Sequence, residues 1–245
     1  MLSDPQSILI TGGTSGVGLE LARQLHGRGH QLAVFARSAE KLARLQDELP
    51  GISIYACELA DRPSVERAWE GVAADHPGLS VLINNAAIQL TPRFLDDDFD
   101  FDGIAHETAV NFLAPAWLSY LALGLFQQSE RRTAIVNISS GLAFYPKTSS
   151  AVYCATKAAL HSLSQSLRYQ LAGTGTAVIE AFLPVVDTPM TAGRGEGKIS
   201  AAQAAAEIVE GVAHGRAEIF VGKARWIPRL ARISPAIPRA ILKGG

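Results

Sequence analysis

The stretch SILITGGTSGVGLE, residues 7–20, joins a run of apolar and β-branched residues directly to a glycine-rich turn and the start of a helix. Gly12, Gly16 and Gly18 permit a tight turn and a close approach of another backbone or a ligand. A helix that begins there offers free N–H groups and the positive end of its dipole to a phosphate. The spacing therefore favours a nucleotide-binding β–α turn, and the alternative is a glycine-rich turn that binds nothing.

Short apolar runs alternate with helix-length amphipathic segments along the rest of the chain. Strands that read as continuous apolar runs are expected where helices cover both faces of a sheet. The pattern predicts a single α/β domain, a Rossmann-type doubly wound sheet of about seven parallel strands with helices on both faces. The strands are predicted at 7–11, 31–36, 52–56, 81–85, 134–139, 177–182 and 218–222. The helices are predicted near 16–28, 39–48, 63–75, 103–128, 152–172 and 201–213.

The composition is that of a soluble globular protein, with 48% hydrophobic residues and a net charge of −1 over 245 residues. Such a charge balance gives no electrostatic reason to expect nucleic acid as a partner. The amino-terminal segment lacks the pattern of a secretory signal, and no uninterrupted apolar run approaches the ~18 residues of a membrane span. Cys57 and Cys154 are too few for a disulfide framework or a tetrahedral zinc site. We therefore expect a cytoplasmic protein without a metal site.

The end of the second predicted strand bears on the choice of cofactor. A carboxylate at this place would bind the two adenosine-ribose hydroxyls of NAD. Ala36 supplies none, whereas the planar guanidinium of Arg37 suits a 2′-phosphate, and Ser38 with Thr14 or Ser15 adds hydroxyl donors. These residues favour NADP(H). The alternative is that Arg37 is simply solvated ahead of the next helix.

Polar residues also follow the third and fourth predicted strands. Either Glu58 or Asp61 would reach an adenine, or Asp61 caps the next helix. The NNAA segment at 84–87 would let a backbone approach a ribose, and its alternative is an ordinary strand exit.

Three further polar side chains are predicted near the same edge of the sheet. Asn111 lies among apolar residues of a helix, where an amide without hydrogen bonds is costly. It either satisfies a local kink near Pro115 or lines a site. Ser139 and Ser140 end the fifth strand, where serines either cap the backbone or touch a substrate.

Tyr153 and Lys157 lie four residues apart in SAVYCATKAA (150–159), so they share one face of a predicted helix. Their small neighbours leave room for a flat group alongside. A phenol with a pKa near ~10 is a poor acid–base catalyst at neutral pH. An ammonium about 4 Å away contributes on the order of 4 kcal/mol, or roughly three pKa units. The pair is therefore predicted to transfer a proton.

Together these motifs resemble those of the short-chain dehydrogenase/reductase family over nearly the whole chain. The family places its catalytic serine thirteen residues before its tyrosine, which selects Ser140 over Ser139. The resemblance implies a catalytic tetrad of Asn111, Ser140, Tyr153 and Lys157. The matching pieces are TGGTSGVG (11–18), NNAA (84–87), VN (110–111), ISS (138–140) and YCATK (153–157). SSGLAF (139–144) and QSLRYQL (165–171) look most like the oxidoreductase branch associated with D-alanine–lipoteichoic-acid operons.

The resemblance also implies a set of residues that contact the cofactor. Three positions depart from the family pattern: Ala87 replaces a glycine, Glu58 stands where an aspartate is usual, and Val185 follows Pro184 in place of glycine. A β-branched residue disfavours a positive φ, so the loop over the nicotinamide is expected to follow a different path. Thr188 holds the position expected to bind the carboxamide. The implied contacts are Gly12, Thr14, Ser15, Gly16, Val17, Gly18, Arg37, Ser38, Glu58, Leu59, Asn85, Ala86, Tyr153, Lys157, Pro184, Val186 and Thr188.

The predicted activity is a reversible carbonyl–alcohol interconversion by an NADP(H)-dependent oxidoreductase, with NAD(H) as the alternative cofactor. By resemblance, Tyr153 exchanges the proton, Ser140 hydrogen-bonds the substrate oxygen, Lys157 holds the nicotinamide ribose, and Asn111 positions a water. The alternative is a catalytically quiet NADP(H)-binding regulatory or scaffold protein, which the complete tetrad disfavours. The substrate is a small-molecule carbonyl or alcohol, with its pocket expected between segments 89–103 and 188–200. Glycines in the second segment suit a mobile lid.

The last part of the chain, 223–245, is predicted to extend the Rossmann domain formed by 1–222. From residue 222 it holds six Lys or Arg and no Asp or Glu. Three prolines break any long amphipathic helix, which favours a lid or a subunit contact over a membrane anchor. Apolar stripes on the helices at 103–128 and 152–172, which pair across subunits in the family, predict a homodimer or homotetramer.

Overall fold

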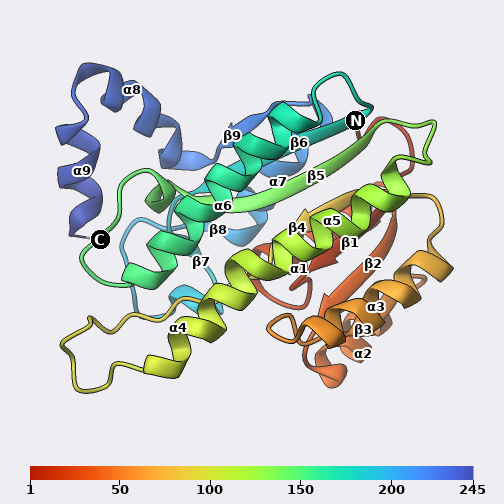
Figure 1. Ribbon diagram of the computed structural model, residues 1–245, viewed down its shortest axis with the longest axis horizontal. Helices are drawn as coiled ribbons and strands as arrows, with labels where there is room; N and C mark the ends of the chain where they lie inside the picture. Colours follow the sequence, from red (N-terminus) through yellow and green to blue (C-terminus); the bar gives the residue numbers. More distant parts are fainter. Residues whose placement is uncertain (245) are drawn as a thin grey trace.

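The computed structural model describes residues 1–244, and seven parallel strands form the sheet at its centre (Figure 1). The spatial order is β3-β2-β1-β4-β5-β6-β9, so the winding reverses between β1 and β4. This is the predicted doubly wound topology, in which ligands bind beyond the carboxyl ends of the strands. The strands are β1 Ser7–Thr11, β2 Gln31–Ala36, β3 Ser53–Ala56, β4 Leu79–Asn84, β5 Thr133–Ser140, β6 Thr176–Leu183 and β9 Glu218–Phe220.

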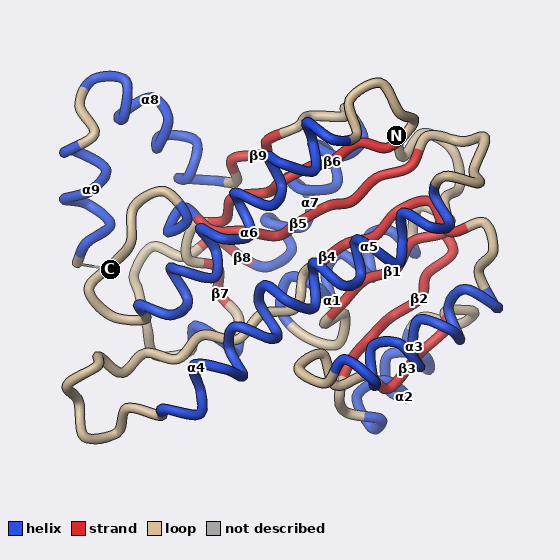
Figure 2. The backbone as a smooth tube through the Cα atoms, viewed as in Figure 1, coloured by secondary structure: helices blue, strands red, loops and turns tan. Residues whose placement is uncertain are grey.

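Helices cover both faces of the sheet (Figures 1 and 2). On one face α1 packs beside α7, and on the other α3, α5 and α6 lie in front of the strands in Figure 1. The helices are α1 Gly16–His26, α2 Ala39–Glu48, α3 Arg62–Asp75, α4 Phe101–Thr108, α5 Ala114–Phe126, α6 Ala151–Gln170, α7 Ala201–Ala213, α8 Ile227–Ile233 and α9 Ala236–Lys243.

The core is split into two apolar clusters by the sheet, because successive strand side chains point to opposite faces. Ile8 and Ile10 belong to the cluster under α1 and α7, whereas Leu9 belongs to the cluster under α3 and α5. Every residue of β1 and β4 is buried. Burial on both faces explains why these strands read as continuous apolar runs in the sequence.

The predicted strands lie within two residues of the observed ones, but the predicted helix 103–128 is not one α-helix. A π-helix, Ala109–Leu113, separates α4 from α5. The strand predicted at 218–222 ends early, because Gly222 takes a φ of +52° and begins a 3-10 helix. A separate pair of short strands, β7 Val186–Asp187 and β8 Ile199–Ser200, was not predicted.

The continuous helical segment Phe101–Phe126 is long and apolar enough to cross a membrane by length and composition, with a mean hydropathy of 1.5. Asp102, His106 and Glu107 interrupt the segment, so it does not read as a continuous apolar run in the sequence. Half of this apolar window is buried inside the fold, as in the core helix of a globular protein.

The basic tail forms two short helices, α8 and α9, which extend from the body of the molecule (Figure 1). Pro228 lies in the first turn of α8, where its missing N–H has no intrahelical acceptor. Pro235 is the N-cap of α9, so the predicted interruption by proline is confirmed. The end of α9 is held by Thr148, whose backbone N–H and hydroxyl both donate to Lys243 O. Gly245 lies outside the described residues.

Two glycines allow the backbone conformation and the available space to be tested separately. Gly124 is exposed within α5 and Gly29 lies in a turn with φ +81°, and a Cβ on either would contact nothing within 4 Å. We expect Gly124→Ala to raise the free energy of unfolding by about 0.5–1 kcal/mol, because alanine is the better helix former. Gly29→Ala should lower it, because of its positive φ. Urea denaturation of both variants checks this, and equal shifts would contradict the described backbone.

Candidate active site

The turn between β1 and α1 is held against the exit of β4 by Thr11. Its Oγ1 accepts the backbone N–H groups of Asn85 and Ala86, each at 3.0 Å. In return, Asn85 Nδ2 donates to Thr11 O at 2.9 Å and to Gly12 O at 3.3 Å. The NNAA segment is therefore more than an ordinary strand exit. The side-chain amide of Asn85 shapes the turn, and the contact of Asn85 with the cofactor stays a prediction.

The turn forms a cradle that only glycine can line. Gly12 and Gly16 have φ values of +69° and +53°, and a Cβ on Gly18 would lie 2.3 Å from Gly12 O. Ser15 is the N-cap of α1 without a side-chain cap hydrogen bond, and no acidic residue lies in the first turn. The N–H groups of α1 are therefore free for an anion, and the cradle fits the pyrophosphate of a dinucleotide. Thr14 is half-buried beside it, and Val17 is buried in the core.

The guanidinium of Arg37 is available beyond the end of β2. Its Nη1 lies 3.9 Å from Glu58 Oε2, and the Arg37 side chain is 64% exposed. An exposed pair at this distance contributes little, so it would not hold Arg37 back from a phosphate. Ser38 is the N-cap of α2, since its Oγ accepts the N–H of Lys41 at 3.2 Å.

The loop after β3 shows which of its two carboxylates is structural. Asp61 is the N-cap of α3, because its Oδ2 accepts the N–H of Ser64 at 3.0 Å. This resolves the alternative left open by the sequence. Glu58 Oε1 accepts the N–H of Ala60 at 3.1 Å. Leu59 is 7% exposed and packs in the core.

The segment after β6 lies against the glycine-rich turn although some 170 residues separate them in sequence. A Cβ on Gly16 would lie 3.0 Å from Thr188 Cγ2. Pro184 is half-buried, and Val186 is buried where β7 pairs with β8. Among residues 1–244, Ser150 is the only non-glycine residue with a positive φ, so Val185 carries no such strain.

Of the two serines that end β5, only Ser140 faces the tyrosine. Ser139 is 3% exposed, and its Oγ has no hydrogen-bond partner. Ser140 Oγ accepts the N–H of Leu142 at 3.2 Å, and its contact with Tyr153 favours the phenolate. The geometry therefore agrees with the choice of Ser140 made from the thirteen-residue spacing.

Tyr153 and Lys157 share one face of α6, as the four-residue spacing predicts. Lys157 Nζ lies 5.6 Å from the centre of the Tyr153 ring and donates to Ile138 O at 2.9 Å. Lys157 is 2% exposed, and burial lowers the pKa of its ammonium to about 8.

The pKa of Tyr153 is shifted in the direction opposite to that predicted. Burial raises it above the ordinary value of a phenol, and the contact with Ser140 lowers it only in part. The expectation that Lys157 brings this pKa down is therefore wrong for this structure. A surface-like dielectric does not hold here, because burial of Tyr153 destabilises its phenolate more than the contacts with Ser140 and Arg194 stabilise it.

Asn111 lies in the π-helix, and its side chain connects the loop after β4 to α6. Its Oδ1 accepts the N–H of Ile88 at 2.9 Å, while its Nδ2 donates to Ile88 O at 2.9 Å and to Thr156 Oγ1 at 3.2 Å. These hydrogen bonds go to Ile88 and Thr156 and not to the helix near Pro115, so they do not satisfy a local kink, and the place of Asn111 in the site stays a prediction. π-Helical turns are frequent at functional sites.

A small cavity lies beside the start of α6. It measures about 110 Å³ and is lined by part of segment 89–103, by Glu107 and by Ser150 to Val152. Segment 188–200, the other predicted wall, does not line it. Glu107 is 1% exposed, its Oε1 accepts the N–H of Leu90 at 3.1 Å, and burial raises the pKa of its carboxyl.

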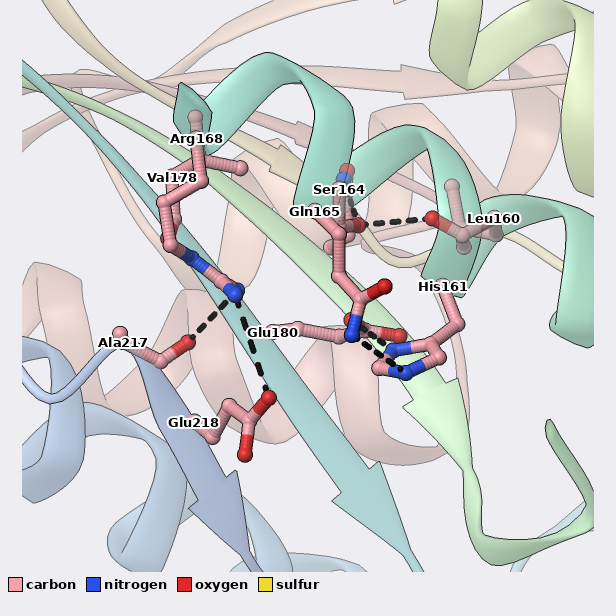
Figure 3. A network of polar contacts seen from close by, with 10 residues as sticks. Leu160, His161, Ser164, Gln165, Arg168, Val178, Glu180, Ala217 and Glu218 are labelled. Atoms are coloured by element: carbon pink, nitrogen blue, oxygen red, sulfur yellow. Dashed lines mark hydrogen bonds and ion pairs between the residues drawn. The ribbon is translucent and has the colours of Figure 1, made fainter. Parts of the chain in front are cut away.

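Sequence reasoning missed several buried polar residues near the site. Thr11 and Glu107 hold loops, and Asn137 bonds Ser164 of α6. His161 of α6 contacts Glu180 of β6 (Figure 3). A signal was present in the sequence, because Glu180 interrupts the apolar run of β6 and Asn137 that of β5. Among residues 1–244, no cluster of three or more His, Cys, Asp or Glu is arranged to hold a metal ion.

Comparison with known proteins agrees with this arrangement. The family model described as short chain dehydrogenase matches residues 6–199. The protein named "Uncharacterized oxidoreductase DltE" of Bacillus subtilis (strain 168) is 44% identical over 183 residues, which cover 74% of this chain and 72% of that protein.

Solved structures share the whole fold. A short chain dehydrogenase from Burkholderia cenocepacia J2315, in complex with NADP, superimposes with a TM-score of 0.87 at 24% identity and covers 98% of each chain. A short chain dehydrogenase/reductase from Burkholderia phymatum, in complex with NAD, gives a TM-score of 0.83 at 19% identity, covering 95% of this chain and 96% of that one. With its match over 194 residues, the chain belongs to the short-chain dehydrogenase family of oxidoreductases.

Proposed function

We propose that the protein is an NADP(H)-dependent oxidoreductase that interconverts a carbonyl and an alcohol, with Tyr153 as the acid and base. The observation that carries the proposal is the buried pair on α6. The Tyr153 phenol lies beside the Lys157 ammonium and Ser140, at the sheet edge where the glycine cradle would place a dinucleotide.

The residues that would hold the cofactor come from the ends of β1, β2 and β6 and from helix α6. The cradle of Gly12, Gly16 and Gly18 would take the pyrophosphate, and Arg37 the 2′-phosphate of the adenosine ribose. Lys157 would hold the nicotinamide ribose. Thr188, which packs against the cradle, would bind the carboxamide of the nicotinamide. When bound, the nicotinamide supplies or accepts the hydride.

The protein's own groups handle the oxygen and the proton. Ser140 donates a hydrogen bond to the substrate oxygen, and Tyr153 donates its proton to that oxygen during reduction. A phenol whose pKa is raised by burial stays protonated at neutral pH, which favours the reducing direction. Asn111 acts by bonding Ile88 and Thr156, which keeps the loop after β4 in register with α6.

Proteins of this fold with NADP and with NAD are both known, so the preference for NADP(H) rests on Arg37 and on the lack of a carboxylate at Ala36. We further propose a cytoplasmic homodimer or homotetramer. The exposed Tyr120 on α5 and Tyr169 on α6 offer apolar surface for such contacts. A catalytically quiet NADP(H)-binding protein is the second candidate, favoured only by the raised Tyr153 pKa.

A panel of ketones, aldehydes and alcohols, followed by the absorbance of both nicotinamide cofactors, tests the proposed function. Turnover of at least one carbonyl with NADPH is expected. Tight NADPH binding without turnover across the panel would favour the catalytically quiet protein.

Tyr153→Phe should lower kcat to less than a tenth of the wild-type value and change the NADPH dissociation constant by no more than a few-fold. The substitution removes the proton that chemistry needs and keeps the ring. Tyr169→Phe, at an exposed position on the same helix, is the matched control and should leave kcat unchanged. Lys157→Ala should damage both kcat and cofactor binding. A Tyr153→Phe enzyme with a tenth of the activity would refute the role of the phenol.

Carbonyl reduction should depend on pH through Lys157. Its pKa is lowered by burial to about 8, so the ammonium is present below that pH and is lost as the pH rises through it. We therefore expect kcat for reduction to be level near neutral pH. Above the Lys157 pKa of about 8, kcat should fall about tenfold per pH unit. Steady-state rates between pH 6 and 9.5, with circular dichroism to confirm folding, check this. A rate that stays level to pH 9.5 would contradict the assigned charge.

NADPH should be preferred over NADH by at least about tenfold in kcat/KM, since a charge-assisted contact contributes about 1.5–3 kcal/mol. The double substitution Ala36→Asp with Arg37→Ala should reverse the order. Arg44→Ala, which removes an exposed arginine from α2, is the control and should keep it. Both cofactors are measured on each protein with one ketone. A wild type that favours NADH would show that Arg37 does not bind the phosphate.

A further inference from the structure

A row of buried polar side chains crosses the sheet next to the candidate site. Asn84, Asn137 and Glu180 are register partners on β4, β5 and β6. Asn84 Nδ2 donates to Asn137 Oδ1 at 2.8 Å, and Asn137 Nδ2 donates to Ser164 Oγ of α6 at 2.9 Å. All three row members are at most 3% exposed. The charged member of this row is Glu180, and a charge buried in the sheet needs a partner that stabilises it.

Glu180 carries that charge, and its side chain is fully buried. Its Oε2 lies 2.8 Å from His161 Nδ1, while its Oε1 has no hydrogen-bond partner among residues 1–244 (Figure 3). Gln165 Nε2 lies 3.1 Å from His161 Nε2. With the Gln165 amide in this orientation, its nitrogen donates to His161 Nε2, and His161 Nδ1 donates to the Glu180 carboxylate.

A fully buried carboxylate with one hydrogen bond is costly unless an opposite charge lies near it. Arg168 of α6 is engaged elsewhere, because it donates to Val178 O and Ala217 O and lies 3.9 Å from Glu218. Lys157 remains. It lies one helical turn before His161 on the same face of α6 and is 2% exposed.

The dependence is mutual, because the buried ammonium of Lys157 also needs a counter-charge. Its Nζ donates to a neutral carbonyl, Ile138 O. Two carboxyl groups act against the effect of burial on the pKa of Lys157: Glu180 of β6 and Glu107 of α4. Of the two carboxyl groups, Glu180 has the larger effect on the pKa of Lys157. Tyr153 faces Lys157 from its own helix and is neutral when protonated.

The surroundings of Glu180 exclude water. The ring of Phe144 packs edge-on to His161 at 4.7 Å between centroids, and Phe182 does so at 5.4 Å. Phe220 stacks on Phe182 at 4.8 Å. A charge held in such an apolar setting acts over a longer distance than one in water, because the local dielectric is low.

We propose that Glu180 is the buried counter-charge of Lys157, a positioning residue that keeps the lysine charged in the dry part of the site, with His161 holding the carboxylate. The inference deepens the proposed function and rests on it, since Lys157 acts there as an ammonium. It assigns a role to a carboxylate that does not touch cofactor or substrate.

Glu180→Gln tests the proposal with little change of shape, since the amide oxygen still accepts from His161. The alkaline limit of kcat for reduction should move down by about one pH unit, as expected when a nearby opposite charge is lost. At pH 6, where Lys157 stays protonated, kcat should lie within about threefold of wild type. Glu180→Asp keeps the charge and should keep the wild-type limit, even if the protein is less stable.

Glu218→Gln is the matched control, because Glu218 is the register partner of Glu180 on β9 and is 39% exposed. It should leave the alkaline limit in place. An E180Q enzyme with the same limit as wild type and E218Q would overturn the proposal. Active Tyr153→Phe and Lys157→Ala enzymes would instead refute the proposed function.

A direct titration of Lys157 by NMR of ¹³C-lysine-labelled protein does not depend on activity or on the folding of a variant. In the wild type Lys157 should titrate near its pKa of about 8, and in Glu180→Gln about one unit lower. If Glu180→Gln does not fold, the wild type alone decides. A Lys157 that titrates at about 7 or below, as expected of a buried ammonium without a counter-charge, would overturn the proposal.

Discussion

One ammonium buried at the edge of the sheet is the constraint on which the candidate site depends. Lys157 is held by Ile138 O and lies beside the Tyr153 ring, with Glu180 on the next strand. Burying a charge is unfavourable unless the fold surrounds it with matched partners. The residues around Lys157 supply them, so the contacts that fix α6 on the sheet also hold this lysine beside the Tyr153 phenol.

The parallel sheet brings the remaining parts to this lysine. Because parallel strands end at one edge, the glycine cradle after β1, Arg37 after β2, and Ser140 at the end of β5 share that edge. Polar contacts then fix the segments that follow these strands relative to one another. Thr11 bonds the exit of β4 to the cradle, and Asn111 joins the following loop to α6. Backbone geometry, rather than any single side chain, positions the candidate cofactor site.

The sequence predicted the sheet well because continuous apolar runs and glycine signals are local. Ser140, Tyr153 and Lys157 were found because their spacing on one strand and one helix is fixed by the motif. The π-helix at Asn111 was missed, since it differs from an α-helix by one residue per turn. The direction of the Tyr153 pKa shift and the role of Glu180 depend on burial between distant segments, which no spacing of residues records.

The proposed function depends on hydride transfer from the cofactor to a carbonyl carbon, and label transfer measures that step. The protein is incubated with NADPH deuterated at the reactive carbon and with each of a panel of ketones, and the products are analysed by mass spectrometry. We expect one deuterium from the cofactor on the carbinol carbon of at least one alcohol, and none there when unlabelled NADPH is used in D₂O. Bound and unconsumed NADPH, with no deuterated alcohol from any ketone tested, would contradict it.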